Sequence, residues 1–110
     1  MSTDQIEAAP AEADIDALLE NARAASELLK ALSHEARLVI LCLLVDGRRS
    51  VSELEAILRL RQPAVSQQLA RLRAENLVAT HRDGKNVYYS LARPEVAEII
   101  GALHRVFCKA

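Results

Sequence analysis

The chain is poor in aromatic residues and in long apolar runs. Only three of its 110 residues are aromatic, two tyrosines and one phenylalanine, and there is no tryptophan. RNA-binding platforms of the RRM and OB type stack bases on aromatic side chains, so this composition argues against them. The longest apolar run covers residues 38–45, whereas a membrane-spanning helix needs about 20 residues. We therefore expect no membrane partner.

Basic residues are missing from the start of the chain. Residues 1–20 contain six acidic residues and no Lys or Arg. This pattern excludes a secretory signal and a mitochondrial presequence, so we expect a cytoplasmic protein. Residues 48–86, in contrast, hold eight basic and four acidic residues. An acidic head on a basic body indicates a surface for a polyanion, although mixed charge is also typical of an ordinary solvated surface.

Cysteine is scarce as well. The two cysteines, Cys42 and Cys108, form no CxxC motif, which argues against a thioredoxin-type site and a zinc knuckle. In a reducing compartment a permanent disulfide is not expected, but a transient, sensing one is compatible with the sequence. Cys42 also fits the role of a small apolar residue in a packed helix. Cys108 lies beside Arg105 and Lys109, whose positive charge favours a thiolate.

The length fits a single domain. With 51% hydrophobic residues the chain can form a core. Residues 1–13 show no periodicity and are predicted to be a flexible acidic tail, which leaves residues 14–110 as the folded domain. Apolar residues from Ile15 to Leu32 recur every three or four positions and predict a long amphipathic helix.

A second helix is expected between Ser33, as its N-cap, and Gly47, just past its end. Its length and cap favour a helix over the rival interpretation, a buried strand. Because residues 38–45 are apolar nearly all round, this helix should be the most buried element. The sequence Ser50-Val51-Ser52-Glu53 then predicts a capping box that opens a third helix.

Pro63 suits the first position of a fourth helix, because that position tolerates a missing N–H. Residues 77–91 have the pattern of a β-hairpin, in which Asp83-Gly84 would form a type I′ turn. Pro94 opens a last helix whose apolar stripe ends at Val106 or Phe107. The predicted order is four helices, two strands and one helix.

Two short helices joined by a tight turn and followed by a basic hairpin indicate a winged helix-turn-helix, a mainly α fold with a β-hairpin wing. The fourth helix would bury Val65, Leu69 and Leu72 and present small and polar residues to a major groove. The side-chain amide of Gln67 can form a bidentate pair of hydrogen bonds with adenine. The predicted DNA-contacting residues are Gln62, Ala64, Ser66, Gln67, Gln68 and Arg71 on the helix, and Arg82, Lys85 and Asn86 near the hairpin tip.

Three segments, "ALSHEARLVIL", "QPAVSQQLARLRAENLV" and "RDGKNVYYSL", occur in the order found in the ArsR/SmtB family, and the resemblance covers roughly residues 28–91. The resemblance implies a dimeric, effector-responsive repressor that binds palindromic operator DNA. The first and last helices form the subunit interface in that family. The interface residues implied here are Leu18, Leu19, Ala22, Ile99 and Leu103.

The metal sites of the family are not matched. The thiolate motif Cys-Val-Cys-Asp of its arsenic and cadmium sensors falls on residues 50–53, where hydroxyls replace both thiols and are poor ligands for soft metals. The last helix offers Glu95, Glu98 and His104, without the spacing of the interfacial zinc site. We therefore expect neither a resident metal nor a cofactor.

One cysteine in the second helix and one near the end of the last helix resemble the BigR/SqrR branch of the family. That resemblance implies that reactive sulfur species link Cys42 and Cys108 within one subunit and release the DNA. A peroxide-type thiol switch and a Cu(I) or Zn site of Cys42, His104 and Cys108 remain open. From another class, the chain could be a winged-helix module that binds proteins. No local nucleophile–base pair is present, so an enzyme is not expected.

Overall fold

The computed structural model describes residues 11–59 and 62–108 and divides into two compact units, residues 1–33 and 34–110. Most of the predicted tail, residues 1–13, lies outside the described residues. In the first unit, helix α1 (Glu12–Leu32) confirms the predicted long helix. Both the backbone N–H and the hydroxyl of Ser33 donate to the carbonyl oxygen of Lys30 and close this helix. The prediction that Ser33 caps the next helix is therefore wrong.

Helix α2 (Glu35–Leu43) opens the second unit, and its N-cap is His34. The chain leaves the helix earlier than predicted, and Gly47 follows with a φ of 142°. The helix buries the side chains of Ile40 and Leu41, so the prediction of a helix instead of a strand is confirmed. The expectation that it is the most buried element is wrong, because Val39 on its other side is 41% exposed.

Helix α3 (Val51–Leu58) and helix α4 (Gln62–Ala74) form the helix-turn-helix. Helix α3 ends at Arg59, a non-glycine residue in the left-handed region with a φ of 55°. Helix α4 ends in a Schellman motif, in which the N–H groups of Asn76 and Leu77 donate to the carbonyls of Arg73 and Leu72. Asn76, with a φ of 60°, supplies the left-handed residue that this ending requires.

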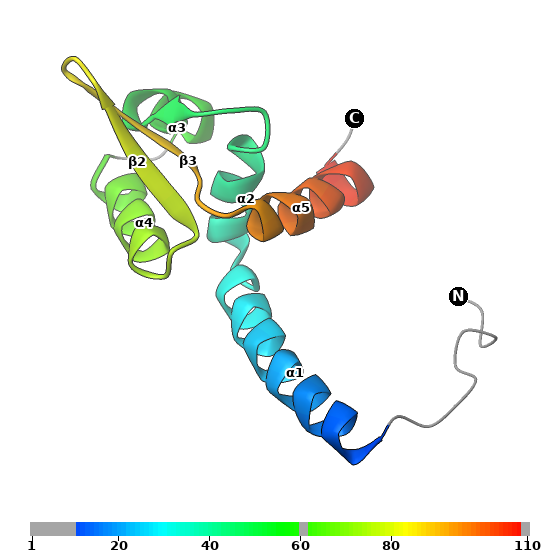
Figure 1. Ribbon diagram of the computed structural model, residues 1–110. Coiled ribbons are helices and arrows are strands. Elements are labelled where there is room, and N and C mark those ends of the chain that lie inside the picture. Colours follow the sequence, from blue (N-terminus) through cyan, green and yellow to red (C-terminus); the bar gives the residue numbers. More distant parts are fainter. Residues whose placement is uncertain (1–10, 60–61, 109–110) are drawn as a thin grey trace. The chain divides into compact units, whose positions relative to one another are not determined.

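A three-stranded antiparallel sheet follows the order β1-β3-β2. Strand β2 (Val78–Asp83) and strand β3 (Asn86–Leu91) are the predicted hairpin, which Figure 1 shows extending as a wing beside α3 and α4. Strand β1 (Arg49–Ser50) pairs with β3 and was not predicted. With only two residues it is too short to show an alternating pattern.

The hairpin turn differs from the prediction. Asp83 pairs with Asn86 in the ladder, so the two-residue loop is Gly84-Lys85. Gly84 has a φ of 64°, and Lys85 is not among the residues of positive φ. A positive φ at the first central position alone is the pattern of a type II′ turn, whereas type I′ needs it at both.

Helix α5 (Pro94–Leu103) starts with proline in its first turn, as predicted, and packs on α2 through a face that buries Val96 and Ile100. It continues as a single π-helical turn, η2 (His104–Cys108). Val106 and Phe107 are 72% and 77% exposed. The end of the predicted apolar stripe is therefore exposed in the single chain, and it lies on a π turn, whose angular spacing differs from that of the α-helix.

Candidate nucleic-acid interface

The outer face of α4 is small and polar, as the sequence predicts. Val65, Leu69 and Leu72 are fully buried and fix which side of the helix faces the core. Side chains on the other side are exposed and short or flexible, so a double helix could approach the backbone closely. The exposed residues are Ala64, Ser66, Gln67, Ala70 and Arg71.

The two remaining glutamines predicted to contact DNA differ from Gln67. Gln62 is the first residue of α4, but its side chain lies outside the described residues. Gln68 is half-buried, and its Oε1 atom is shielded from solvent without a hydrogen-bond partner in the part of the chain that the structure describes. Among the side chains of α4 that the structure describes, Gln67 is therefore the exposed amide.

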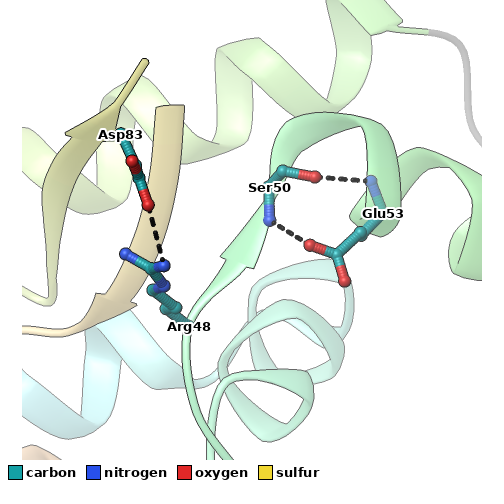
Figure 2. A network of polar contacts seen from close by, with 4 residues as sticks. All are labelled: Arg48, Ser50, Glu53 and Asp83. Atoms are coloured by element: carbon teal, nitrogen blue, oxygen red, sulfur yellow. Dashed lines mark hydrogen bonds and ion pairs between the residues drawn. The ribbon is translucent and has the colours of Figure 1, made fainter. Parts of the chain in front are cut away.

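The tip of the wing is basic. Arg82, Lys85 and Asn86 are all exposed around the turn. Asp83 is the acidic residue among them, and the guanidinium of Arg48 forms an ion pair with it at 3.3 Å. Figure 2 shows Arg48 reaching across to Asp83. Sequence reasoning counted Arg48 among the basic residues but did not assign it a partner, because the two are 35 positions apart.

The capping box of α3 is formed as predicted. The hydroxyl of Ser50 accepts from the N–H of Glu53, and the carboxylate of Glu53 accepts from the N–H of Ser50 (Figure 2). Donation from the backbone N–H of Ser50 to the carboxylate, then the Ser50 hydroxyl and the positive charge of Arg49 and Arg48, lower the pKa of Glu53. The residues aligned with a metal-binding motif of the family thus serve to start the first helix of the helix-turn-helix.

The two cysteines lie on elements of the second unit. Cys42 is half-buried near the end of α2. Cys108 is the last residue of η2, and its side chain lies outside the described residues. Among the residues that are described, no three His, Cys, Asp or Glu side chains are grouped so that they could hold a metal ion. Because the side chain of Cys108 lies outside the described residues, this statement does not extend to the set of Cys42, His104 and Cys108.

The residues that the family resemblance places in a subunit interface lie on α1 in the first unit and on α5 in the second unit. On α1, Leu18 and Leu19 are 61% and 56% exposed, and Ala22 is exposed too. On α5, Ile99 and Leu103 are half-buried. None of the described helices is both long and apolar enough to cross a bilayer.

Residues 34–80 match the model of the arsR family of bacterial regulatory proteins. The biofilm growth-associated repressor of Agrobacterium fabrum is 44% identical over 97 residues, which cover 88% of this chain and 83% of that protein. The chain belongs to the ArsR family.

Solved structures of the family share its fold. Reduced HlyU from Vibrio cholerae, a protein named a transcriptional activator, superposes with a TM-score of 0.78 at 44% identity. That match covers 84% of this chain and 97% of HlyU. The repressor BigR from Xylella fastidiosa gives a TM-score of 0.79 at 40% identity, covering 84% and 92% of the two chains.

The comparisons confirm the predicted winged helix and the resemblance to BigR. Members of the ArsR family are DNA-binding transcriptional regulators and not enzymes. The helix-turn-helix and its wing are therefore the candidate DNA interface of this chain.

Proposed function

We propose that the protein is a homodimeric repressor that binds operator DNA through α4 and the wing, and that reactive sulfur species release it by linking Cys42 and Cys108. The observation that carries the DNA part is the exposed face of α4, where small side chains surround Gln67. A helix with such a face can lie deep in a major groove, and Gln67 can donate to and accept from the edge of adenine.

The wing supports this interaction from the side. Arg82 and Lys85 are exposed at its tip and can bind phosphates or enter the minor groove of DNA. Asn86 can donate a hydrogen bond to the sugar-phosphate backbone. Contacts of this kind give affinity that falls steeply with salt, because each neutralised phosphate releases counterions.

A dimer would place two such readers on a palindromic site. Exposed apolar residues on α1, among them Leu18, Leu19 and Leu29, are the kind of surface that a second subunit covers. Two-fold symmetry would present the two α4 helices to half-sites about 34 Å apart. A shift of one subunit against the other would move the two α4 helices out of register with the half-sites, and the affinity of the dimer for the DNA would then fall.

The thiol chemistry needs two steps. The thiolate of one cysteine attacks the outer sulfur of a low-molecular persulfide, RSSH, which forms a protein persulfide and releases RSH. The thiolate of the second cysteine attacks the inner sulfur of that persulfide, forms the disulfide and releases HS⁻. If further sulfur atoms are retained, the link is a polysulfide. Such a link between α2, which carries Cys42, and η2, which carries Cys108, would change how α5 packs on α2.

Mass spectrometry separates a polysulfide link from a peroxide switch, because each retained sulfur adds about 32 Da. A plain disulfide lacks two hydrogens whichever oxidant forms it, so for that product the effector separates the two: a persulfide, and not an equal concentration of hydrogen peroxide, should release the DNA. A Cu(I) or Zn site of Cys42, His104 and Cys108 would retain metal only in the native protein.

The DNA part is tested with a duplex selected from a random library by the wild-type protein. Fluorescence anisotropy across a salt series should give a steep negative slope of log K against log salt. Lys85→Ala should reduce the slope by about one and weaken binding to all sequences, whereas Gln67→Ala should weaken the selected duplex more than a scrambled one. Arg93 is an exposed arginine at the start of α5, and Arg93→Ala is the matched control for the loss of one positive charge outside the helix-turn-helix and the wing. A flat salt dependence, or no selected sequence at all, would instead support a module that binds proteins.

A further inference from the structure

Two consecutive arginines connect the wing to the rest of the second unit. Arg48 forms an ion pair with Asp83 at the end of β2, and its guanidinium lies 4.2 Å from the centre of the Tyr88 ring on β3. The Nε of Arg49 donates to the carbonyl oxygen of Leu43 at 2.6 Å. Arg48 therefore contacts the hairpin, and Arg49 binds the end of α2.

The register of the hairpin explains how one guanidinium reaches both groups. His81 pairs with Tyr88 and Asp83 pairs with Asn86. Because side chains alternate along a strand, Tyr88 and Asp83 share one face of the hairpin. Arg48 lies on that face and contacts residues from both strands, so its contacts oppose a swing of the wing away from β1.

We propose that Arg48 is a positioning residue, which holds the wing at the angle needed for DNA by binding Asp83 and Tyr88. The inference rests on the proposed function, since it matters only if the wing contacts DNA. Asp83 lies between Arg82 and Gly84-Lys85, where an unpaired carboxylate would repel phosphate. The ion pair with Arg48 offsets that charge, and it connects the wing to the residue that precedes β1.

Simple electrostatics and positioning predict opposite effects of one substitution. Asp83→Asn removes a negative charge from the DNA-binding surface, so electrostatics alone predicts tighter binding. Positioning predicts weaker binding, by about two- to fivefold, the range that an exposed ion pair can transmit. Asn is also favoured in turns, so the hairpin itself should be preserved.

The chain offers a matched control. Glu95 pairs with Arg93 at 3.3 Å, the same distance as the pair of Arg48 with Asp83, and both pairs are exposed. Glu95→Gln removes the same charge and the same kind of contact outside the wing. Its affinity for the selected duplex should stay within the error of the wild type.

A second substitution separates positioning from a direct phosphate contact by Arg48. Arg48→Lys keeps the charge but loses the planar guanidinium that both stacks on a ring and binds a carboxylate. Positioning predicts that Arg48→Lys weakens binding as Asp83→Asn does, without changing the salt slope. A phosphate contact predicts nearly wild-type binding for Arg48→Lys and a slope reduced by about one for Arg48→Ala.

The experiment measures anisotropy of the selected duplex with the full chain, together with NMR of the protein without DNA. In the wild type the side-chain protons of Arg48 should be shifted upfield by the ring of Tyr88, and Asp83→Asn should reduce this shift. Weaker binding of Asp83→Asn and Arg48→Lys, with Glu95→Gln unchanged, supports the inference. Equal or tighter binding of Asp83→Asn overturns it. If Lys85→Ala has no effect either, the wing does not contact DNA, and it is the proposed function that fails.

Discussion

The Nε of Arg49 donates a hydrogen bond of 2.6 Å to the carbonyl oxygen of Leu43, the last residue of α2. Arg49 also pairs with Tyr89 through the β1–β3 ladder. One residue therefore satisfies a carbonyl at the end of the helix that carries Cys42 and continues into the sheet that carries the wing.

Loss of this contact should destabilise the fold. Arg49→Ala leaves the carbonyl of Leu43 without its donor in a half-buried place, so we expect the free energy of unfolding to fall by about 1–3 kcal/mol. Urea unfolding followed by circular dichroism measures the change. Arg93→Ala, which removes an exposed arginine, should cost less than about 1 kcal/mol. Equal effects of the two substitutions would mean that the Leu43 contact contributes nothing specific.

Two glycines should respond oppositely to alanine. Gly84 has a φ of 64°, so a side chain there is strained even though nothing lies within 4 Å of the added Cβ. We expect Gly84→Ala to lower stability by about 1 kcal/mol. Gly101 lies inside α5, where an added Cβ meets Arg105 at an ordinary 3.7 Å, so Gly101→Ala should raise stability by roughly 0.5–1 kcal/mol. Thermal melts of the two variants decide the signs, and the same sign for both would contradict this account.

Local signals in the sequence predicted most of the fold. The capping box of Ser50 and Glu53 marked the start of α3, and the spacing of Val65, Leu69 and Leu72 identified the buried face of α4. Strand β1 was missed because its pairing with β3 depends on residues far along the chain. The end of α5 was missed because a pattern of threes and fours does not distinguish an α-helical from a π-helical turn.

The capping box should make stability depend on pH. The pKa of Glu53 is lowered in the folded state by its hydrogen bonds to Ser50. The ionised carboxylate therefore stabilises the fold fully at pH values above the pKa that Glu has in the unfolded chain, about 4.3. The effect is lost as pH falls through the lower folded pKa. Wild type should therefore be more stable than Glu53→Gln at pH 7, and the difference should begin to shrink at about pH 4.3 and vanish once the pH is below the folded pKa.

Urea unfolding of wild type and Glu53→Gln at several pH values measures this dependence. The control is Glu55→Gln, which removes an equal charge from α3 outside the capping box. A difference between wild type and Glu53→Gln that is constant with pH would show that the charge of Glu53 does not stabilise the helix.

The core face of α4 should be far more sensitive than an exposed apolar residue of α3. Leu69 is fully buried, so Leu69→Ala should cost about 2–5 kcal/mol through lost burial and the cavity left behind. Ile57 is 45% exposed, and Ile57→Ala should cost clearly less. Chemical unfolding compares the two variants, and similar losses would contradict the assigned face of the helix.

The candidate DNA site was predictable to the extent that it is local. The exposure of Gln67 and Arg71 follows from helical spacing, and that of Arg82 and Lys85 follows from the hairpin. The half-burial of Gln68 and the pairing of Arg48 with Asp83 depend on packing between elements, which periodicity does not contain. The role of Cys42 and Cys108 is a prediction from family resemblance.

The central claim is that a link between Cys42 and Cys108 controls DNA binding. The most direct measurement is anisotropy of the selected duplex with wild type and Cys108→Ser, before and after a low-molecular persulfide and again after reductant, with intact mass recorded at each step. We expect wild type to release the duplex with the mass of a disulfide or a polysulfide, to rebind it after reduction, and Cys108→Ser to stay bound throughout. Equal release of Cys108→Ser, or retention of the duplex by the linked wild type, would contradict the account.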